Sequence, residues 1–294
     1  MRSIARGVRG AAAALRRPLW VPPGHYYSPI AGPSDVDRAL ARAGDTGAAV
    51  PGVDLRADAQ RALVTELAPL WADLPDELPM TAATGWRYHQ VNAMFGLADA
   101  AVYSAMLRHL RPRRVIEVGS GFSSAIALDT ADRWLPEVSF TFVEPYPERL
   151  LGLLDERDRA RTTLLRAPVQ DVPLSTYDAL CPGDLLFVDS THVSKAGSDV
   201  NWLVFEVLPR LADGVVVHFH DVFWPFEYPR EWLREGRGWT ENYLLRAFLA
   251  YNTRFEILLF NSWLWQAERE LVARTLPATL DQHPGGIWLR KVPG

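Results

Sequence analysis

The sequence predicts an α/β protein with a doubly wound, mostly parallel sheet and a helical N-terminal cap. After Pro112 the chain contains seven short apolar runs, and stretches long enough to form helices separate most of them. The runs are continuously apolar, which is typical of parallel strands covered by helices on both faces of the sheet. Parallel strands joined in this way need right-handed crossovers, so we expect helices on both faces.

The expected strands are, in chain order, "RVIEVG", "SFTFVEP", "TTLLRA", "DLLFVDS", "GVVVHFHD", "FEILLFN" and "GIWLRKV". The last two runs lie closer together than the others, and the segment between them, "NSWLWQAERELVARTL", is poorly amphipathic. We therefore expect the final strand to run antiparallel to its neighbours.

Residues 1–110 are expected to form an N-terminal arm and helical cap, and residues 111–294 the sheet domain. Apolar residues at helical spacing predict three helices in the first part, over 35–43 with Ser34 as the cap, 57–73 and 97–110. The stretch from 18 to 34 is too rich in Pro and Gly for regular structure, yet it carries four aromatic or histidine side chains. We interpret it as an extended arm that lies over another part of the molecule.

Composition excludes several classes of protein. The net charge of −4 gives no overall basic field, so nucleic acid is not an expected partner. Cys181 is the single cysteine, which excludes an intrachain disulfide and a CxxC-type zinc site and fits a reducing, cytoplasmic compartment. No uninterrupted run of about 18 apolar residues is present to span a bilayer, so no membrane partner is expected.

The first 20 residues are rich in arginine and free of acidic residues. A transit peptide or a helix on a membrane surface has this composition, but the apolar centre "AAAAL" is too weak for a secretory signal. We interpret the segment as an ordinary amphipathic or frayed N-terminus. The helices that follow it offer a surface for a homo-oligomer or a cover for a ligand site.

The stretch "RRVIEVGSGFSS", residues 113–124, contains two glycines directly after the first strand. In a doubly wound sheet, ligands lie at the carboxyl ends of the strands, where glycines let the backbone approach and the next helix offers its positive N-terminus. The ligand could be a nicotinamide dinucleotide, a nucleoside triphosphate or S-adenosylmethionine. A P-loop is excluded because no GK[ST] follows, and the dinucleotide fingerprint is incomplete because Ser124 replaces its third glycine.

Acidic residues at the ends of three successive strands add to this pattern. Glu117 closes the first strand and Glu144 the second, where a carboxylate can accept hydrogen bonds from ribose hydroxyls. Asp171 follows the third strand, where an acid or amide commonly meets an adenine amino group. Each has an ordinary alternative as a turn or solvated residue, and Ser123 and Ser124 can cap the next helix. Three acids in this order are much less expected by chance.

The segments "IEVGSGFSS", "VEP", "VQDVP", "LLFVDSTH" and "VVVHFHD" resemble the successive motifs of class I S-adenosylmethionine-dependent methyltransferases, which have a Rossmann-like fold. The resemblance covers about residues 85 to 294, and "PPGHYYSP" is similar to an upstream segment of bacterial members. It implies a glycine loop that binds the methionine part of the cofactor, an acid that binds ribose and residues that border adenine. The implied cofactor-binding residues are Glu117, Gly119, Ser120, Gly121, Ser123, Glu144, Gln170 and Asp171.

Residues at the ends of strands four and five are candidates for catalysis. Strand four ends in Asp189, with His192 three residues later, and strand five carries His218 and His220 before Asp221. Adjacent parallel strands bring Asp189 and Asp221 to one edge, where two carboxylates suit Mg²⁺ or Mn²⁺ and a nearby base can deprotonate an acceptor hydroxyl.

Each of these residues also has a second interpretation. Asp189 could instead bind backbone amides or the cofactor, and His192 could only fix its loop. His220 could orient Asp221 or act as the base itself. His218 is expected to be a buried strand histidine with a satisfied partner.

The spacing of Asp189 and His192 resembles the D-x-x-K/H pattern of catechol-type O-methyltransferases and of the metal-dependent sugar O-methyltransferases of macrolide biosynthesis. The resemblance implies that Asp189 and Asp221 are metal ligands and that His192 is the base. The chain departs from that family at Val222, where the family usually has Asn or Asp.

The segment "VFWPFEYPREWLREGRGW" after Asp221 is dense in aromatic residues. It is either a hydrophobic lid packed on its own domain or a wall of the acceptor site. For the second alternative, the substrate-binding residues are Trp224, Phe226 and Tyr228, together with Tyr27 from the arm.

The sequence therefore favours an S-adenosylmethionine-dependent methyltransferase that acts on a small-molecule acceptor, with O-methylation of a hydroxyl in a sugar or secondary metabolite as the expected reaction. An NAD(P)-dependent oxidoreductase on the same sheet and a non-catalytic cofactor-binding descendant are the alternatives.

Overall fold

The computed structural model describes residues 20–43, 45 and 47–294, so the Arg-rich segment 1–19 lies outside the described residues. The chain forms one seven-stranded sheet with the order β3-β2-β1-β4-β5-β7-β6. The strands are β1 (Arg114–Val118), β2 (Ser139–Val143), β3 (Thr162–Leu165), β4 (Leu185–Val188), β5 (Val216–His220), β6 (Phe255–Phe260) and β7 (Gly286–Lys291).

The first five strands are parallel, and β7 runs antiparallel between β5 and β6. Both the α/β fold class and the reversed final strand are therefore confirmed. From β1 the chain moves outward to β2 and β3, and it then returns to the other side of β1 with β4. This switch point brings the carboxyl ends of β1, β2, β4 and β5 to one edge of the sheet, where ligands bind in such folds.

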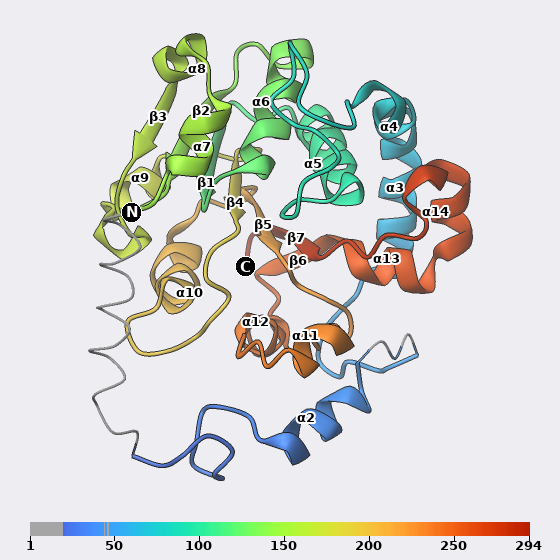
Figure 1. Cartoon of the computed structure of the whole chain (residues 1–294), viewed down its shortest axis with the longest axis vertical. Helices are drawn as coiled ribbons and strands as arrows, with labels where there is room; N and C mark the ends of the chain where they lie inside the picture. Colours follow the sequence, from blue (N-terminus) through green and yellow to red (C-terminus); the bar gives the residue numbers. More distant parts are fainter. Residues whose placement is uncertain (1–19, 44, 46) are drawn as a thin grey trace.

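The helices connect the strands and cover the sheet (Figure 1). They are α2 (Pro33–Leu40), α3 (Ala57–Trp71), α4 (Leu74–Glu77), α5 (Leu97–Leu110), α6 (Phe122–Trp134), α7 (Glu148–Leu153), α8 (Glu156–Arg161), α9 (Leu174–Asp178), α10 (Asp199–Trp202), α11 (Arg230–Arg234), α12 (Glu241–Leu249), α13 (Asn261–Ala267) and α14 (Arg269–Thr275). A π-helical turn, Leu203–Val207, continues α10, and 3₁₀ turns occupy Val169–Asp171, Leu208–Arg210 and Pro277–Thr279.

Two of the predicted N-terminal helices appear as α3 and α5, but the prediction for the first helix was wrong in its start. Helix α2 begins at Pro33 with Gly32 as its N-cap, rather than after Ser34. Proline favours the first helical position because its missing N–H would have no partner there. The Asp35 carboxylate accepts a hydrogen bond from the Gly32 N–H at 2.9 Å, which closes the first turn.

The hydrophobic core runs without a break from the N-terminal helices into the sheet. Helix α5 packs against α6 and α3, and α3 also contacts β6 (Figure 1). The alanines of α5 are almost fully buried, which lets the neighbouring helices approach closely. The proposed boundary at residue 110 stays a prediction, since α3 and α5 share the core of the sheet. No helix in the described part of the chain is long and apolar enough to cross a membrane.

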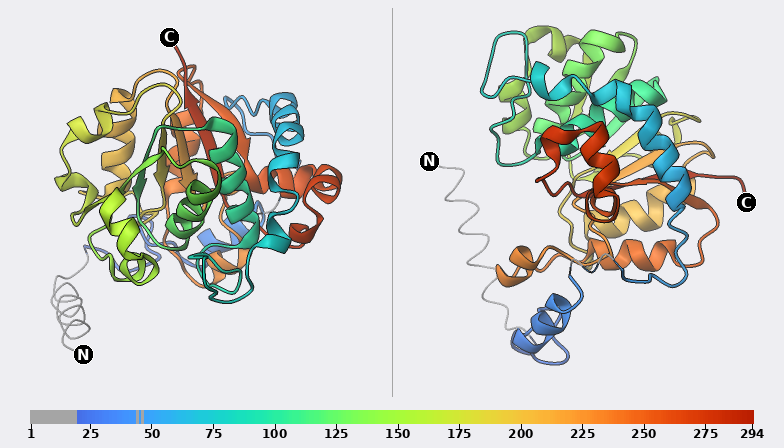
Figure 2. Two further views of the ribbon diagram at one scale, coloured as in Figure 1. Left: turned by 90° about the horizontal axis from the view of Figure 1, so that it is seen from above. Right: turned by 90° about the vertical axis from the view of Figure 1, so that its right-hand side faces the viewer.

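A second, smaller apolar cluster joins α2 to the segment that follows β5. Val36, Ala39 and Leu40 of α2 pack against a group of buried aromatic and aliphatic side chains around α11, which includes Phe223 and Tyr228. In the right-hand view of Figure 2, α2 lies at one end of the molecule, beside the segment that contains α11. This cluster therefore attaches α2 to the segment that follows β5.

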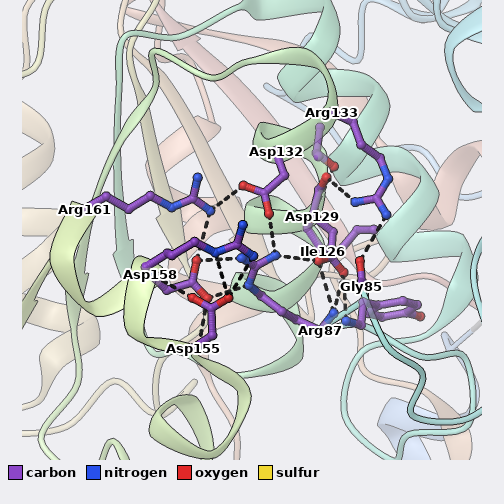
Figure 3. A network of polar contacts seen from close by, with 12 residues as sticks. Gly85, Arg87, Ile126, Asp129, Asp132, Arg133, Asp155, Asp158 and Arg161 are labelled. Atoms are coloured by element: carbon purple, nitrogen blue, oxygen red, sulfur yellow. Dashed lines mark hydrogen bonds and ion pairs between the residues drawn. The ribbon is translucent and has the colours of Figure 1, made fainter.

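The loop between α4 and α5 is fixed by a network of ion pairs centred on Arg87 (Figure 3). The Arg87 guanidinium donates to Asp158 at 2.6 Å, to Asp129 at 2.9 Å and to Asp132 at 2.8 Å. Arg161 donates to Asp158 at 3.0 Å and pairs with Asp132 at 2.6 Å, so two arginines share these carboxylates. We call these five residues the Arg87 network; they tie the loop to α6 and α8.

Candidate active site

The glycine loop between β1 and α6 lies in contact with the end of β4. Gly119 has φ +79°, and a Cβ at this position would lie 1.8 Å from the backbone oxygen of Asp189. Any residue other than glycine would therefore push β1 and β4 apart. Gly121 is also crowded, since a Cβ there would come within 3.0 Å of the Arg149 side chain. The loop thus places its backbone, and not side chains, at the switch point.

Glu144, at the end of β2, is held against this loop. Its carboxylate accepts hydrogen bonds from the backbone N–H of Ser120 at 3.1 Å and of Tyr146 at 2.8 Å. A cavity of about 420 Å³ opens beside it. Three predicted cofactor-binding residues line this cavity, namely Gly119, Glu144 and Gln170, and so does Asp189. Four further lining residues that the sequence did not single out are Tyr146, Thr191, Lys195 and Ser198.

Glu117 and Ser123 lie beneath the glycine loop rather than along this cavity. The hydroxyls of Ser123 and Ser124 donate to the Glu117 carboxylate at 2.6 and 2.8 Å, and all three side chains are buried. Burial raises the pKa of Glu117 to about 8, against the lowering effect of the two hydroxyls. These residues shape the loop from inside the protein.

Asp171 is exposed and does not line the cavity, so the structure does not support its assignment to adenine. The reason is local. Val169–Asp171 form a 3₁₀ turn in which Val169 points into the core and Gln170 donates through Nε2 to the Gly197 oxygen at 2.8 Å. Gln170 therefore borders the cavity, while the carboxylate of the next residue turns to solvent.

Asp189, His192 and Asp221 come together at the carboxyl edge of β4 and β5. His192 Nε2 lies 3.3 Å from Asp189 Oδ1 and 3.7 Å from Asp221 Oδ2. One ligand atom from each of the three residues can be chosen so that all lie within 4.8 Å of one another. His192 and Asp221 both have positive φ, at +60° and +55°, which is uncommon away from glycine and concentrates at functional sites.

Glu241, the first residue of α12, completes this arrangement and was missed in the sequence. Its Oε2 lies 2.9 Å from His192 Nδ1, and its side chain is fully buried. The stretch "WTENYLL" indicates only a helix start with an acid in the first turn. Nothing in it connects Glu241 with a histidine 49 residues earlier, so no sequence signal could have found this contact.

Two more titratable groups border the same edge. His220 Nε2 is 3.7 Å from Asp221 Oδ1, and the His220 ring packs against Phe95 with centroids 4.9 Å apart. Asp99, from the first turn of α5, accepts from Asn261 Nδ2 at 3.3 Å, and burial raises its pKa to about 7. The sequence did not suggest Asp99. We call the group the His192 cluster; it contains Asp99, Asp189, His192, His220, Asp221 and Glu241.

Negative charge dominates the His192 cluster. Among the residues that the structure describes, no lysine or arginine forms an ion pair with its four carboxyl groups. Burial opposes protonation of His192, but its hydrogen bonds to Asp189 and Glu241 raise the pKa of this imidazole well above the usual range. Burial raises the pKa of Asp221, whereas the histidines outweigh burial at Asp189 and lower its pKa.

His218 lies outside this group. Its ring packs on Trp288 and Phe187 with centroid distances of 4.3 and 4.5 Å, and neither ring nitrogen has a hydrogen-bond partner. The expectation of a buried histidine was right, but the expectation of a satisfied partner was wrong. Burial lowers the pKa of His218 well below its usual value, so the ring is neutral. Val222 is also fully buried and supplies no ligand.

The aromatic segment after β5 packs mostly on its own domain. Phe226 is buried against Phe260, with ring centroids 5.2 Å apart, so its assignment to an acceptor wall is not supported. Trp224 and Tyr228 are also largely buried, but they line a second cavity of about 520 Å³. Tyr27 is 60% exposed on the arm, stacks on Trp20 and lines neither cavity.

The second cavity is lined by the segment that follows Asp221. Phe223 and Pro284, two of its lining residues, are close in sequence to the backbone hydrogen bond from Asp221 N–H to the Gly285 oxygen. Asp189 is the member of the His192 cluster that lines the first cavity, and no member of the cluster is among the residues that line the second.

Comparison with known proteins agrees with this geometry. The family model described as a methyltransferase domain matches residues 116–222, which run from β1 to just past β5. An uncharacterized protein of Archaeoglobus fulgidus is 36% identical over 166 residues, which cover 54% of this chain and 73% of the relative.

Solved structures with a similar fold include two methyltransferases. One is the S-adenosylhomocysteine-bound methyltransferase PaMTH1 of Podospora anserina, with 17% identity, coverage of 66% of this chain and 78% of the other, and a TM-score of 0.42. The other is the O-methyltransferase TomG of Streptomyces achromogenes, involved in tomaymycin synthesis and determined with S-adenosylmethionine, with 16% identity, coverage of 79% and 89%, and a TM-score of 0.42.

The domain match contains the glycine loop, Asp189, His192 and Asp221 in a single segment. The chain therefore belongs to one family with the relative from Archaeoglobus fulgidus and carries a methyltransferase domain over residues 116–222.

Proposed function

We propose that the protein transfers the methyl group of S-adenosylmethionine to a hydroxyl oxygen of a small-molecule acceptor. The observation that carries this proposal is the position of His192. Its Nε2 lies 3.3 Å from Asp189, a residue that lines the first cavity, and 3.7 Å from Asp221 at the end of β5. A base held beside the donor site is the arrangement that methyl transfer to a hydroxyl needs.

The first cavity suits S-adenosylmethionine. Glu144 presents a carboxylate that two backbone amides already orient, as a ligand for ribose hydroxyls requires. Gly119 keeps the loop free of side chains where the methionine part would lie, and Gln170 borders the end of the cavity towards β3. The bound cofactor supplies an electrophilic methyl group, so the main tasks of the protein are alignment and removal of the acceptor proton.

His192, in its neutral form, is the residue we assign to proton removal, and its raised pKa means that this form becomes more abundant as pH rises. Its Nδ1 is engaged by Glu241, which leaves Nε2 as the nitrogen that faces the edge of the sheet. Transfer requires the acceptor O–H bond to break, with its proton moving to Nε2, while the oxygen lone pair forms the new bond to the methyl carbon. The carbon–sulfur bond breaks with its electron pair remaining on sulfur, so charge and atoms balance.

Asp189 and Asp221 also fit a divalent cation beside His192. Their carboxylate oxygens lie within 4.8 Å of each other and of a ring nitrogen of His192. Carboxylate oxygens suit Mg²⁺ or Mn²⁺, and His192 Nε2 stays free for the acceptor proton. A bound ion of this kind would lower the pKa of a nearby hydroxyl. Val222 cannot replace the Asn or Asp that the resembling enzymes carry there, because it is an apolar core residue.

The second cavity is our candidate for the acceptor. Trp224 and Tyr228 give it aromatic surface, and Arg230 and His283 give it polar edges. This composition suits an organic molecule of moderate size rather than nucleic acid, and the net charge of −4 points the same way. Assembly into a homo-oligomer stays a prediction.

Calorimetric titration with S-adenosylmethionine and transfer of an isotope-labelled methyl group to a panel of hydroxylated acceptors test the proposal. The protein should bind the cofactor, and Glu144→Ala should weaken binding strongly, while Glu268→Gln, at a distant ion pair with Arg61, should not. Unchanged affinity of Glu144→Ala would refute the ribose assignment. Cofactor binding without turnover of any acceptor would instead favour a non-catalytic descendant.

A further inference from the structure

The contact between His192 and Glu241 joins two segments that are far apart in the sequence. Glu241 is 1% exposed, and its Oε2 lies 2.9 Å from His192 Nδ1. The other carboxylate oxygen, Oε1, has no hydrogen-bond partner among the residues that the structure describes, and burial raises the pKa of the group. A buried carboxylate with one unsatisfied oxygen is costly for the fold, and an apolar side chain would fill the same volume at less cost. Packing alone therefore does not explain a glutamate at this position.

The segment around Glu241 also holds the backbone and the ring of His192. The His192 carbonyl oxygen accepts hydrogen bonds from the N–H groups of Thr240 and Glu241, at 2.9 and 3.1 Å. The Thr240 hydroxyl accepts from Ser194 N–H at 2.7 Å, and the Trp239 ring lies 4.5 Å from the His192 ring. These contacts stabilise His192 in its left-handed conformation, at φ +60°.

The contacts of His192 with Thr240, Glu241 and Trp239 also fix the orientation of the imidazole ring. With Nδ1 bound to Glu241, Nε2 faces Asp189 at 3.3 Å and Asp221 at 3.7 Å. Rotation of the ring by half a turn would break the bond to Glu241 and leave both oxygens of a buried carboxylate without a partner. A hydrogen bond to one ring nitrogen fixes which nitrogen is free to react.

We propose that Glu241 is a positioning residue: its hydrogen bond to Nδ1 holds the His192 ring so that Nε2 is the nitrogen that receives the acceptor proton. This inference rests on the proposed function and assigns a role to a residue that does not line either cavity. Glu241 touches neither donor nor acceptor and acts only through His192.

Glu241→Gln tests the proposal, with Glu268→Gln as a control that makes the same chemical change at a distant ion pair. The acceptor is the one that the labelled-methyl panel identifies. We expect Glu241→Gln to lower kcat by about 10–100-fold, the usual effect of losing a partner that orients a reacting group. KM for the acceptor and the affinity for S-adenosylmethionine should stay unchanged. Equal losses in kcat and cofactor affinity would overturn the proposal, because they would indicate a general structural defect.

A spectroscopic readout separates this proposal from the proposed function. In protein with ¹⁵N-labelled histidine, the proton on His192 Nδ1 should resonate at low field, as protons shared with a carboxylate do, and His192→Gln identifies it by its loss. Glu241→Gln should shift this signal upfield, and Glu268→Gln should not. An unchanged signal in Glu241→Gln contradicts the positioning role, even if no acceptor is turned over. If Glu241→Gln does not fold, Glu241→Asp, which shortens the side chain by one methylene, should give the same shift.

Discussion

The Arg87 network and the His192 cluster each gather several buried or partly buried carboxylates, but they balance the charge differently. In the Arg87 network, two arginines pair with Asp129, Asp132 and Asp158 at 2.6–3.0 Å. The His192 cluster contains four carboxyl groups and two histidines, and no arginine or lysine in the described part of the chain pairs with them. The carboxylates of the Arg87 network are therefore paired with cationic side chains, whereas those of the His192 cluster have only histidines as partners.

This difference separates a structural role from a functional one. A buried ion-pair network with every partner present holds a loop in place, and removing one partner leaves unpaired charge. A cluster with excess negative charge keeps a proton, a cation or a polar ligand nearby, and strongly shifted pKa values mark such sites. The following predictions test this comparison, from the largest expected effect to the smallest.

His192→Gln should affect catalysis far more than stability. Loss of a general base lowers kcat by about 10²–10⁴-fold, and glutamine can still donate a hydrogen bond to the buried Glu241. Methyl transfer under saturating cofactor and acceptor, together with urea unfolding, measures both effects. A variant that keeps most of its turnover would remove His192 from the proposed mechanism.

Arg87→Leu should have the opposite effect and lower stability far more than catalysis. It leaves the fully buried Asp129 without its arginine partner and Asp158 with Arg161 alone, and breaking a buried pair in this way costs about 3–5 kcal/mol. Urea unfolding measures the loss. Arg38→Leu, at an exposed pair with Asp35, should cost no more than about 1 kcal/mol. Similar losses in the two variants would contradict the structural role of the Arg87 network.

Mn²⁺ should stabilise the protein through the His192 cluster. A ligand that binds only the folded state at 100 times its Kd adds about 2.7 kcal/mol of stability. Thermal unfolding with and without the ion measures the shift, which Asp221→Asn should abolish. The matched control is Asp132→Asn in the Arg87 network, which should lower the melting temperature but keep the Mn²⁺ shift. Equal shifts in both variants would place the ion elsewhere.

The smallest expected change, taken per pH unit, is a pH dependence of stability that comes from Glu117. Its folded-state pKa of about 8 lies above the ordinary value of 4.5, so between these values the folded protein holds a proton that the unfolded chain releases. Stability therefore falls as pH rises through this window, with a slope of at most about 1.4 kcal/mol per pH unit.

Glu117→Gln removes this proton exchange. Relative to the wild-type protein, the variant should become more stable as pH rises from about 5 to 8, which urea unfolding at several pH values measures. A constant difference between the two proteins across this range would show that Glu117 is ionised in the fold.

Much of the architecture could be predicted from the sequence because it depends on local patterns. Continuous apolar runs separated by helices predicted the parallel sheet, and a short final connection predicted the reversal of β7. The residues at the strand ends, Asp189 and Asp221, were found because the carboxyl ends of parallel strands must share an edge. His192 follows within three residues of Asp189, so its position was nearly fixed by the same rule.

The errors arose where the direction of a side chain depended on packing. Phe226 lies in an aromatic-rich segment of the kind that lines an acceptor site. In the structure its ring packs against Phe260 and Trp224, so it lies in the core. Asp171 lies directly after Gln170, yet the 3₁₀ turn sends the two side chains to different surroundings. Neither outcome can be read from the local residue pattern.

The sequence by itself determined the strands of the sheet and the acids at the strand ends, because hydrophobic periodicity acts over short stretches of chain. Only the tertiary structure decided that Glu241 and Asp99 lie at the same edge of the sheet and that His192 directs its Nε2 towards Asp189. It also decided that arginines pair with the carboxylates of the Arg87 network and not with those of the His192 cluster in the described part of the chain. These features depend on distances between residues far apart in the sequence, which are fixed only when the core packs.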